Sequence, residues 1–242
     1  MKTNSEIVLN DLYDYPNLKI YQIIGNFKFS LDSILLAEYV KINKNTKNIL
    51  DLCSGNAPIP MILTTKTDAL IDAFEIQEHI YELAKKSIEY NHLNSQITMY
   101  NSDIKEIDNH INFKKYDIIT CNPPYFKVED KNYLNDDLKL AIARHEIKID
   151  LETIFKIASS HLDDKGEFYL VHRVSRLDEI IIYANKYNLN VKNIQMIQTK
   201  KDNKPYIVLV RCIKNSKFGV KVNNIKNIEN QITYQNMFEE DL

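Results

Sequence analysis

Short apolar runs alternate along the chain with stretches whose apolar residues recur at helical spacing. This alternation predicts an α/β fold whose central sheet is largely parallel. The candidate strands are Asn48–Asp51, Ala69–Glu75, Ile97–Asp103, Tyr116–Asn122, Glu167–Arg173, Asn193–Gln198 and Pro205–Ile213. Helical spacing fits Ile59–Thr65, Glu78–Asn91, Leu151–Leu162 and Arg176–Tyr187. The last two strands are joined by a polar stretch too short for a crossover helix, so we expect them to form an antiparallel hairpin.

Length and composition favour one folded domain with small appendages. The chain has 242 residues, of which 44% are hydrophobic and 26% charged, as in ordinary globular proteins. No apolar run reaches the ~18 residues of a membrane span, and the N-terminus lacks the apolar core of a secretory signal, so we expect a cytoplasmic protein. Cys53, Cys121 and Cys212 are widely spaced and form no C-x-x-C pair. They predict reduced thiols, and neither a disulfide framework nor a metal site.

Charge is polarised along the chain although the formal net charge is only -2. That sum argues against a protein that coats nucleic acid without selection. The stretch from Lys192 to Lys226 nevertheless holds nine basic residues and a single acid, Asp202. Lys200 and Lys201 in this stretch are candidates for contacts with RNA phosphates, and a solvated hairpin face is the alternative interpretation.

The first strand runs into a turn of small residues that is a candidate cofactor site. Its sequence is Asp51-Leu52-Cys53-Ser54-Gly55-Asn56-Ala57. Open α/β sheets bind ligands at the carboxyl ends of their strands, where small side chains let the backbone approach the ligand. With Gly55 as its single glycine, the segment is also compatible with an ordinary strand-to-helix turn.

The next two strands also end on acids. Glu75 follows Asp51 by 24 residues and closes the second strand, as expected of an acid that binds the hydroxyls of a nucleoside ribose. Asp103 closes the third strand and could accept the exocyclic amine of an adenine, with Ile76 and Ile104 on the two faces of the ring. Together the three strand ends predict a nucleoside-shaped site.

The sharpest motif is Asn122-Pro123-Pro124-Tyr125, which follows the fourth apolar strand. The prolines fix the backbone and lack N–H groups, so the turn presents acceptors without competing donors. The Asn122 side chain and the Pro123 carbonyl could bind both hydrogens of an exocyclic amine and orient its lone pair, while Tyr125 stacks on the base. The motif predicts methylation of a planar amine that needs no dedicated general base.

These motifs, in this order, resemble the amino-group branch of the Rossmann-like class I methyltransferases. More narrowly, the chain resembles the bacterial family that methylates adenine N6 beside the anticodon of valine tRNA. The resemblance covers about residues 25–176. Beyond the generic motifs, the segments that carry this resemblance are Phe29-Ser30-Leu31-Asp32-Ser33-Ile34-Leu35-Leu36, Phe74-Glu75-Ile76-Gln77, Asn122 to Phe126, Ala143-Arg144-His145-Glu146 and Leu170-Val171-His172-Arg173.

The resemblance implies a seven-stranded, mostly parallel sheet with a C-terminal antiparallel hairpin, S-adenosyl-L-methionine as cofactor and tRNA as substrate. It divides the chain into a leader, residues 1–46, that covers the cleft, and a methyltransferase domain, residues 47–242. The implied cofactor residues are Asp32, Asp51, Cys53, Gly55, Glu75, Ile76, Asp103 and Ile104. The implied RNA residues are Phe126, Arg144, His145 and Glu146, and a salt-bridged helix end is the alternative for the last three. Ala57 departs from the family, which usually has glycine there, and this puts cofactor affinity in question.

Other functions stay open at this stage. An N5-glutamine methyltransferase of release factors uses the same Asn-Pro-Pro-Tyr geometry, but that family usually carries a helical domain before the first strand. A guanine-N2 RNA methyltransferase is a weaker rival. An inactive methyltransferase fold kept as an RNA-binding module would be favoured by loss of Asp51, Glu75 or Asn122, and all three are present.

Overall fold

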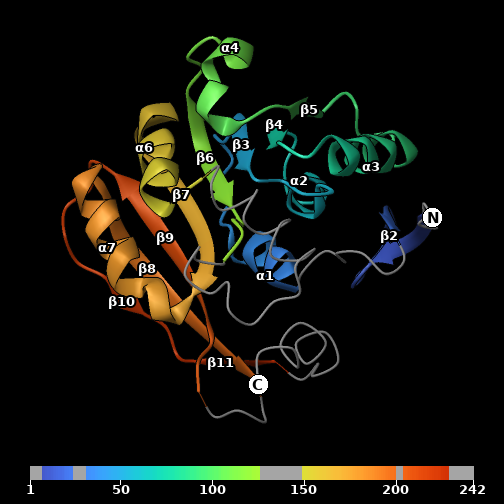
Figure 1. Cartoon of the computed structure of the whole chain (residues 1–242). Helices are drawn as coiled ribbons and strands as arrows, with labels where there is room; N and C mark the ends of the chain where they lie inside the picture. Colours follow the sequence, from blue (N-terminus) through green and yellow to red (C-terminus); the bar gives the residue numbers. More distant parts are fainter. Residues whose placement is uncertain (1–6, 24–30, 126–148, 200–203, 229–242) are drawn as a thin grey trace, which may run out of the picture. The chain divides into compact units, whose positions relative to one another are not determined.

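The computed structural model describes residues 7–23, 31–125, 149–199 and 204–228 (Figure 1). The chain divides into two compact units, Met1–Asn122 and Pro123–Leu242. The strands β1 and β2 and the helix α1 therefore belong to the same unit as the strands β3 to β6. Phe126, Arg144, His145, Glu146, Lys200 and Lys201 lie outside the described residues.

The first unit is built on four parallel strands in the order β6-β3-β4-β5. Apolar residues fill its strands, and the fully buried side chains include Ile49, Leu50, Leu52, Phe74 and Tyr116. The bounds of the elements are β1 (Ile7–Leu12), β2 (Tyr15–Ile23), α1 (Leu31–Tyr39), β3 (Asn48–Leu52), α2 (Pro58–Thr64), β4 (Leu70–Glu75), α3 (Glu78–Tyr90), β5 (Ile97–Asn101), η1 (Ile104–Glu106), α4 (Asp108–Ile111) and β6 (Tyr116–Cys121).

The hairpin β1–β2 was not expected from the sequence, which has a mixed pattern there. In β2, burial alternates through Leu18, Ile20 and Gln22, as in a strand covered on one face. Side chains of α3 bind the backbone of β2: the Ser87 hydroxyl accepts the Tyr21 N–H at 3.0 Å, and Asn91 bonds both backbone groups of Lys19. Most of β1 is exposed, so its hydrophobic signal is weak.

The second unit contains the antiparallel strands β7, β9 and β8, in that order. The predicted hairpin is thus confirmed as β8–β9, and two short strands, β10 and β11, pair parallel with β8. The helices α6 and α7 contact each other and pack against strands of this unit (Figure 1). The bounds are α6 (Leu151–His161), β7 (Leu162–Arg173), η3 (Val174–Arg176), α7 (Leu177–Lys186), β8 (Leu189–Thr199), β9 (Ile207–Lys214), β10 (Lys221–Val222) and β11 (Lys226–Ile228).

The predicted α/β class and the seven predicted strands are present, with shifted bounds. The largest shift is at β7, which begins at Leu162, where the sequence predicted the last residue of a helix. The helix α1 was also not predicted. Its residues Leu31 to Ala37 are all buried, so it lacks the one-sided periodicity that marks an amphipathic helix.

Candidate functional site

The turn after β3 has an unusual backbone. Cys53, Gly55 and Ala57 adopt positive φ angles of 59°, 56° and 65°. A Cβ atom placed on Gly55 would meet nothing within 4 Å, so the turn leaves open space beside its backbone. Ala57 immediately precedes α2 and is fully buried in a conformation that favours glycine. Alanine in place of the expected glycine therefore strains the backbone at this position, at a cost on the order of 1 kcal/mol.

Glu75, at the end of β4, holds this turn. Its buried carboxylate accepts the Gly55 N–H at 2.9 Å and the Gln77 N–H at 2.8 Å. Burial raises the pKa of Glu75, while these backbone donors favour its charged form. The Glu75 carbonyl in turn accepts the Asn101 amide at 2.9 Å and the Ser102 N–H at 3.2 Å. One residue thus ties the ends of β3, β4 and β5 together.

Asp51 lies beneath the turn, with no exposed surface. Strand register places it opposite Thr120 of β6, whose hydroxyl donates to Asp51 Oδ1 at 2.5 Å. The other oxygen, Oδ2, is buried and has no hydrogen-bond partner within the described part of the chain. Burial raises the pKa of Asp51 to about 7, with the Glu75 charge adding to the rise and the hydroxyls of Thr120 and Ser54 opposing it. An unpaired buried carboxylate oxygen is costly, and a donor from a ligand would satisfy it.

Asp103 and its neighbours follow β5. The Asp103 carboxylate accepts the Lys105 N–H at 3.0 Å and caps the short helix η1. Ile104 is 4% exposed and Ile76 is half-buried. The sequence placed Asp103 at the end of the strand, but β5 ends at Asn101 and Asp103 lies two residues further on, where it caps η1.

Asn122 is held by a residue from α1. Its Nδ2 donates to the Ser33 hydroxyl at 2.9 Å, across 89 residues of sequence. Ser33 is 6% exposed, so little water competes for this bond. In this orientation of the amide, Nδ2 donates to Ser33 and Oδ1 is the acceptor atom. The adjacent Asp32 is also buried, in the first turn of α1, where the helix dipole favours a carboxylate.

In the second unit, Tyr125 packs against a histidine. The rings of Tyr125 and His172 have centroids 5.0 Å apart and are tilted by 46°. His172 Nδ1 accepts the Arg173 N–H at 2.8 Å. Burial, followed by the charges of Arg176 and Arg173, lowers the pKa of His172 to about 3. His172 is therefore neutral at physiological pH, and its uncharged ring packs against Tyr125. In the Asn-Pro-Pro-Tyr motif, Pro123 is buried and Pro124 is exposed.

Sequence reasoning missed Thr120, Ser33 and His172 as parts of the site. Thr120 is a polar residue in an otherwise apolar strand, and Ser33 and His172 lie inside segments that carried the family resemblance. All three cysteines are free thiols. Burial and the neighbouring Cys53 raise the pKa of Cys121 well above its usual range, so Cys121 is a poor nucleophile.

Within the described residues, no three His, Cys, Asp or Glu side chains are grouped so that they could hold a metal ion. Among the described helices, none is long and apolar enough to cross a membrane.

The chain is similar to known methyltransferases. Residues 27–206 match the methyltransferase small domain family. The tRNA1(Val) (adenine(37)-N6)-methyltransferase of Flavobacterium psychrophilum is 26% identical over 179 residues, which are 74% of this chain and 75% of the relative.

Solved structures share the fold at low identity. A predicted O-methyltransferase from Agrobacterium tumefaciens aligns with a TM-score of 0.63 at 18% identity, covering 83% of this chain and 90% of the other. M. jannaschii TYW2 in complex with AdoMet aligns with a TM-score of 0.57 at 13% identity, covering 88% of each chain. The Rossmann-like methyltransferase fold is thus confirmed, and because the family match spans well over half of its length, the chain belongs to the methyltransferase small domain family.

Proposed function

We propose that this protein is an S-adenosyl-L-methionine-dependent methyltransferase that modifies the exocyclic N6 of an adenine in tRNA, adjacent to the anticodon of valine tRNA. The observation that carries the proposal is the partly buried bond between Ser33 and Asn122. It orients the amide at the first position of the Asn-Pro-Pro-Tyr motif. The tRNA adenine-N6 activity of the Flavobacterium psychrophilum relative supports the choice of substrate.

The strand ends of the first unit fit a nucleoside cofactor. The buried Asp51 Oδ2 lacks a partner among the described residues, and the space beside Gly55 admits a ligand close to the backbone. Asp51, Gly55 and Glu75 would hold the cofactor, and Asp32, Cys53, Ile76, Asp103 and Ile104 would complete its surroundings. When bound, S-adenosyl-L-methionine supplies an electrophilic methyl group on a sulfonium. The leader, residues 1–46, would cover this cofactor.

The target amine is oriented by the motif itself. An adenine amine is a weak nucleophile because its lone pair is delocalised into the ring. Asn122 Oδ1 and the Pro123 carbonyl accept its two hydrogens and direct the lone pair, while Tyr125, braced by His172, stacks on the base. The methylated amine is a strong acid and releases its proton to water, so no side chain has to act as a base. Pro124 keeps the turn rigid and free of a competing donor.

RNA contacts complete the proposed site. Phe126 continues the motif and would extend the surface on which the base lies. Arg144 would bind phosphate with Glu146 orienting its guanidinium, and His145 lies between them in the chain. Lys200 and Lys201 would bind the RNA backbone near the β8–β9 hairpin. A target adenine in a loop would leave its stack at less cost than one in a duplex.

The test is methyl transfer from labelled S-adenosyl-L-methionine to tRNA that lacks the modification, followed by digestion and mass spectrometry of the nucleosides. Labelled N6-methyladenosine is the expected product. In the same assay Asn122→Ala should lower kcat by about 100- to 1000-fold, because a preorganised polar contact to the reacting group is lost. Binding of S-adenosylhomocysteine should remain as in the wild type.

Release factor serves as the competing acceptor in a parallel reaction. Label in its glutamine and none in tRNA would overturn the choice of substrate. Wild-type turnover by Asn122→Ala would overturn the role assigned to Asn122.

A further inference from the structure

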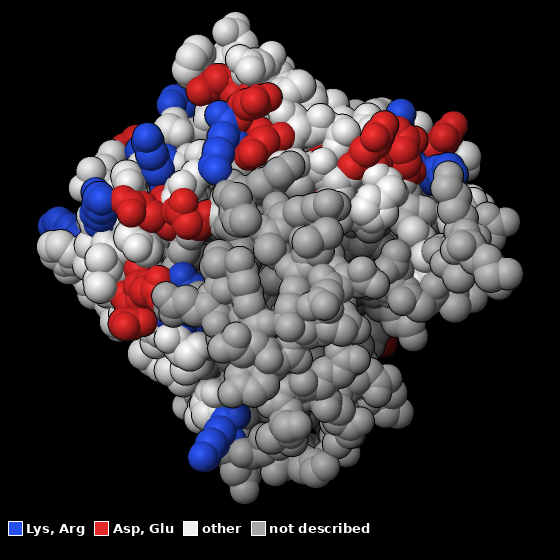
Figure 2. Space-filling model, viewed as in Figure 1, with Lys and Arg blue, Asp and Glu red and all other residues white. Residues whose placement is uncertain are grey.

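The chain after β9 forms an exposed edge that combines lysines with apolar side chains. We call residues 215–228, which include β10 and β11, the edge segment. Phe218 is 81% exposed, and Val220, Val222 and Ile225 are 53%, 57% and 46% exposed. The segment carries three lysines and no acidic residue. Figure 2 shows Lys and Arg side chains mostly next to Asp and Glu on this face, apart from a group at its lower edge.

Polar bonds, and not apolar burial, hold the edge segment in place. Side chains on β8 bind its backbone carbonyls: Asn193 binds that of Lys221 at 3.2 Å, and Gln195 binds that of Asn224 at 2.6 Å. Backbone pairing of β10 and β11 with β8 adds to this. The segment is therefore a fixed feature of the second unit, although its apolar side chains contribute little to the core.

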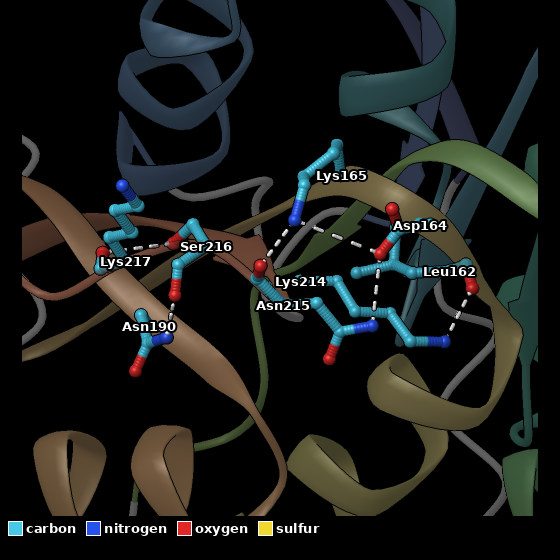
Figure 3. A network of polar contacts seen from close by, with 8 residues as sticks. All are labelled: Leu162, Asp164, Lys165, Asn190, Lys214, Asn215, Ser216 and Lys217. Atoms are coloured by element: carbon cyan, nitrogen blue, oxygen red, sulfur yellow. Dashed lines mark hydrogen bonds and ion pairs between the residues drawn. The ribbon is translucent and has the colours of Figure 1, made fainter.

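The start of the edge segment is fixed by a separate network (Figure 3). Asn215 donates to Asp164 at 2.9 Å and accepts from Lys165, while Asn190 donates to the Ser216 carbonyl. The ammonium group of Lys217 points away from the other residues drawn in Figure 3. Lys217 is exposed, and so is Phe218 immediately after it.

A partner for this surface has to match both positive charge and an exposed aromatic ring. RNA does so, because phosphates attract lysines and unstacked bases stack on aromatic side chains. A lipid surface matches less well, since the backbone of the edge segment is not helical and could not enter hydrocarbon without losing hydrogen bonds to water. An acidic peptide would use the lysines and leave Phe218 without a stacking partner.

We infer that the edge segment is a docking surface for RNA, in which Lys217 and Lys221 contact phosphates and Phe218 stacks on an unpaired base. The identification of this RNA as the tRNA substrate rests on the proposed function. The surface acts in binding and has no part in the chemistry of methyl transfer. Its loss therefore raises KM for tRNA and leaves kcat unchanged.

The test measures the Kd of the full-length protein for unmodified tRNA, with S-adenosylhomocysteine present, over a range of salt concentrations. Phe218→Ala should weaken binding by about tenfold, the size of one lost stacking contact. Lys217→Ala with Lys221→Ala should reduce the slope of log Kd against log salt by about 1.5, since each lysine releases somewhat less than one counterion. The Kd for S-adenosylhomocysteine should be unchanged in both variants.

Matched controls lie in the first unit. Phe113 is 68% exposed, and Lys85 and Lys86 are exposed lysines. Phe113→Ala and the pair Lys85→Ala with Lys86→Ala should leave the Kd for tRNA as in the wild type. An equal loss in the controls, or unchanged binding in the edge variants, overturns the docking surface.

Two further outcomes separate this inference from the proposed function. If the edge variants lose tRNA binding while the wild type makes no N6-methyladenosine, the docking surface stands and the proposed reaction fails. Vesicles containing phosphatidylglycerol test the lipid alternative. If Phe218→Ala abolishes vesicle binding and leaves the Kd for tRNA unchanged, the surface binds lipid and the inference is wrong.

Discussion

The strand-end site of the first unit and the edge segment of the second depart from ordinary folding in opposite ways. The first buries charge: the carboxylates of Asp51 and Glu75 are 0% and 5% exposed. The second exposes apolar surface, with Phe218 at 81%. Both contradict the usual division between core and surface, and such local conflicts are expected where a protein has to bind something.

The two regions differ in what the protein itself supplies to relieve the conflict. Glu75 is satisfied by two backbone N–H groups, so its burial also builds the turn. Asp51 is only partly satisfied, by Thr120. The edge segment has its backbone bonded by amides of β8, while its apolar side chains have no comparable cover within the described part of the chain. Changes at the strand ends should therefore alter stability and binding together, and changes at the edge should alter binding alone.

Removing Glu75 should have the largest effect. Glu75→Ala takes the charged acceptor from Gly55 and Gln77, and each hydrogen bond to a charged group is worth about 1.5–3 kcal/mol. We expect the affinity for S-adenosylhomocysteine to fall by about a thousandfold in isothermal titration calorimetry. Glu75→Gln keeps one acceptor oxygen, so its affinity for S-adenosylhomocysteine should lie between those of the wild type and Glu75→Ala. Glu78→Ala, at an exposed acid three residues later, is the control.

Unchanged affinity in folded Glu75→Ala would mean that Glu75 shapes neither the turn nor the ligand site. Thermal unfolding distinguishes a folded variant with weak binding from one that has lost its structure. Glu75 would then be an ordinary buried carboxylate with no part in ligand binding.

The sequence was sufficient for those parts of the site that depend on local order along the chain. Each strand of the parallel sheet is an apolar run, with Asp51 and Glu75 in the last residues of β3 and β4 and Asp103 two residues after β5. Parallel strands bring their carboxyl ends to one edge, so the predicted proximity of Gly55 and Glu75 needed no further information.

Contacts that depend on strand order and on distant packing were not predictable in the same way. Thr120 faces Asp51 only because β6 is the neighbour of β3, and Ser33 reaches Asn122 from a helix 89 residues earlier. The edge segment has no strong periodic pattern, because its place is set by amide side chains of β8.

The pH dependence of the free energy of unfolding should show the cost of burying Asp51. Its pKa is about 7 in the folded protein and 3.8 as a free group, so the folded state binds more protons between these values. Stability should fall as pH rises from about 4 to 7, by on the order of 3 kcal/mol from this group. Urea unfolding at a series of pH values measures it, and Asp51→Asn should remove this part of the pH dependence.

Two other buried groups titrate in the same experiment. Glu75 also has a raised pKa and adds a fall in stability with rising pH. The pKa of His172 is lowered to about 3, so His172 adds a rise in stability up to its unfolded value near 6.5. The difference between Asp51→Asn and the wild type isolates Asp51, with Asp68→Asn as the exposed control. Identical pH profiles would show that Asp51 is not a source of strain.

Ser33 should have a smaller effect, confined to turnover. Ser33→Ala removes the acceptor of Asn122 Nδ2 and so weakens the interactions that orient the amide. We expect kcat to fall by about tenfold, equivalent to one ordinary hydrogen bond, with KM for S-adenosyl-L-methionine unchanged. Ser33→Thr keeps a hydroxyl and should restore most of kcat. A rise in KM without a change in kcat would instead assign Ser33 to cofactor binding.

The smallest effect on stability is expected for Phe218 in the edge segment. Phe218 contributes little to the core, so Phe218→Ala should change the free energy of unfolding by no more than about 0.5 kcal/mol in urea titration, as is usual for surface substitutions. Phe155, which is fully buried and packs edge-to-face on Phe168 at 5.3 Å, gives the contrast within the same unit. Phe155→Ala should cost about 3–5 kcal/mol. If Phe218→Ala destabilised the protein as strongly, its ring would be part of the fold, and the edge segment would have no apolar surface to spare for a partner.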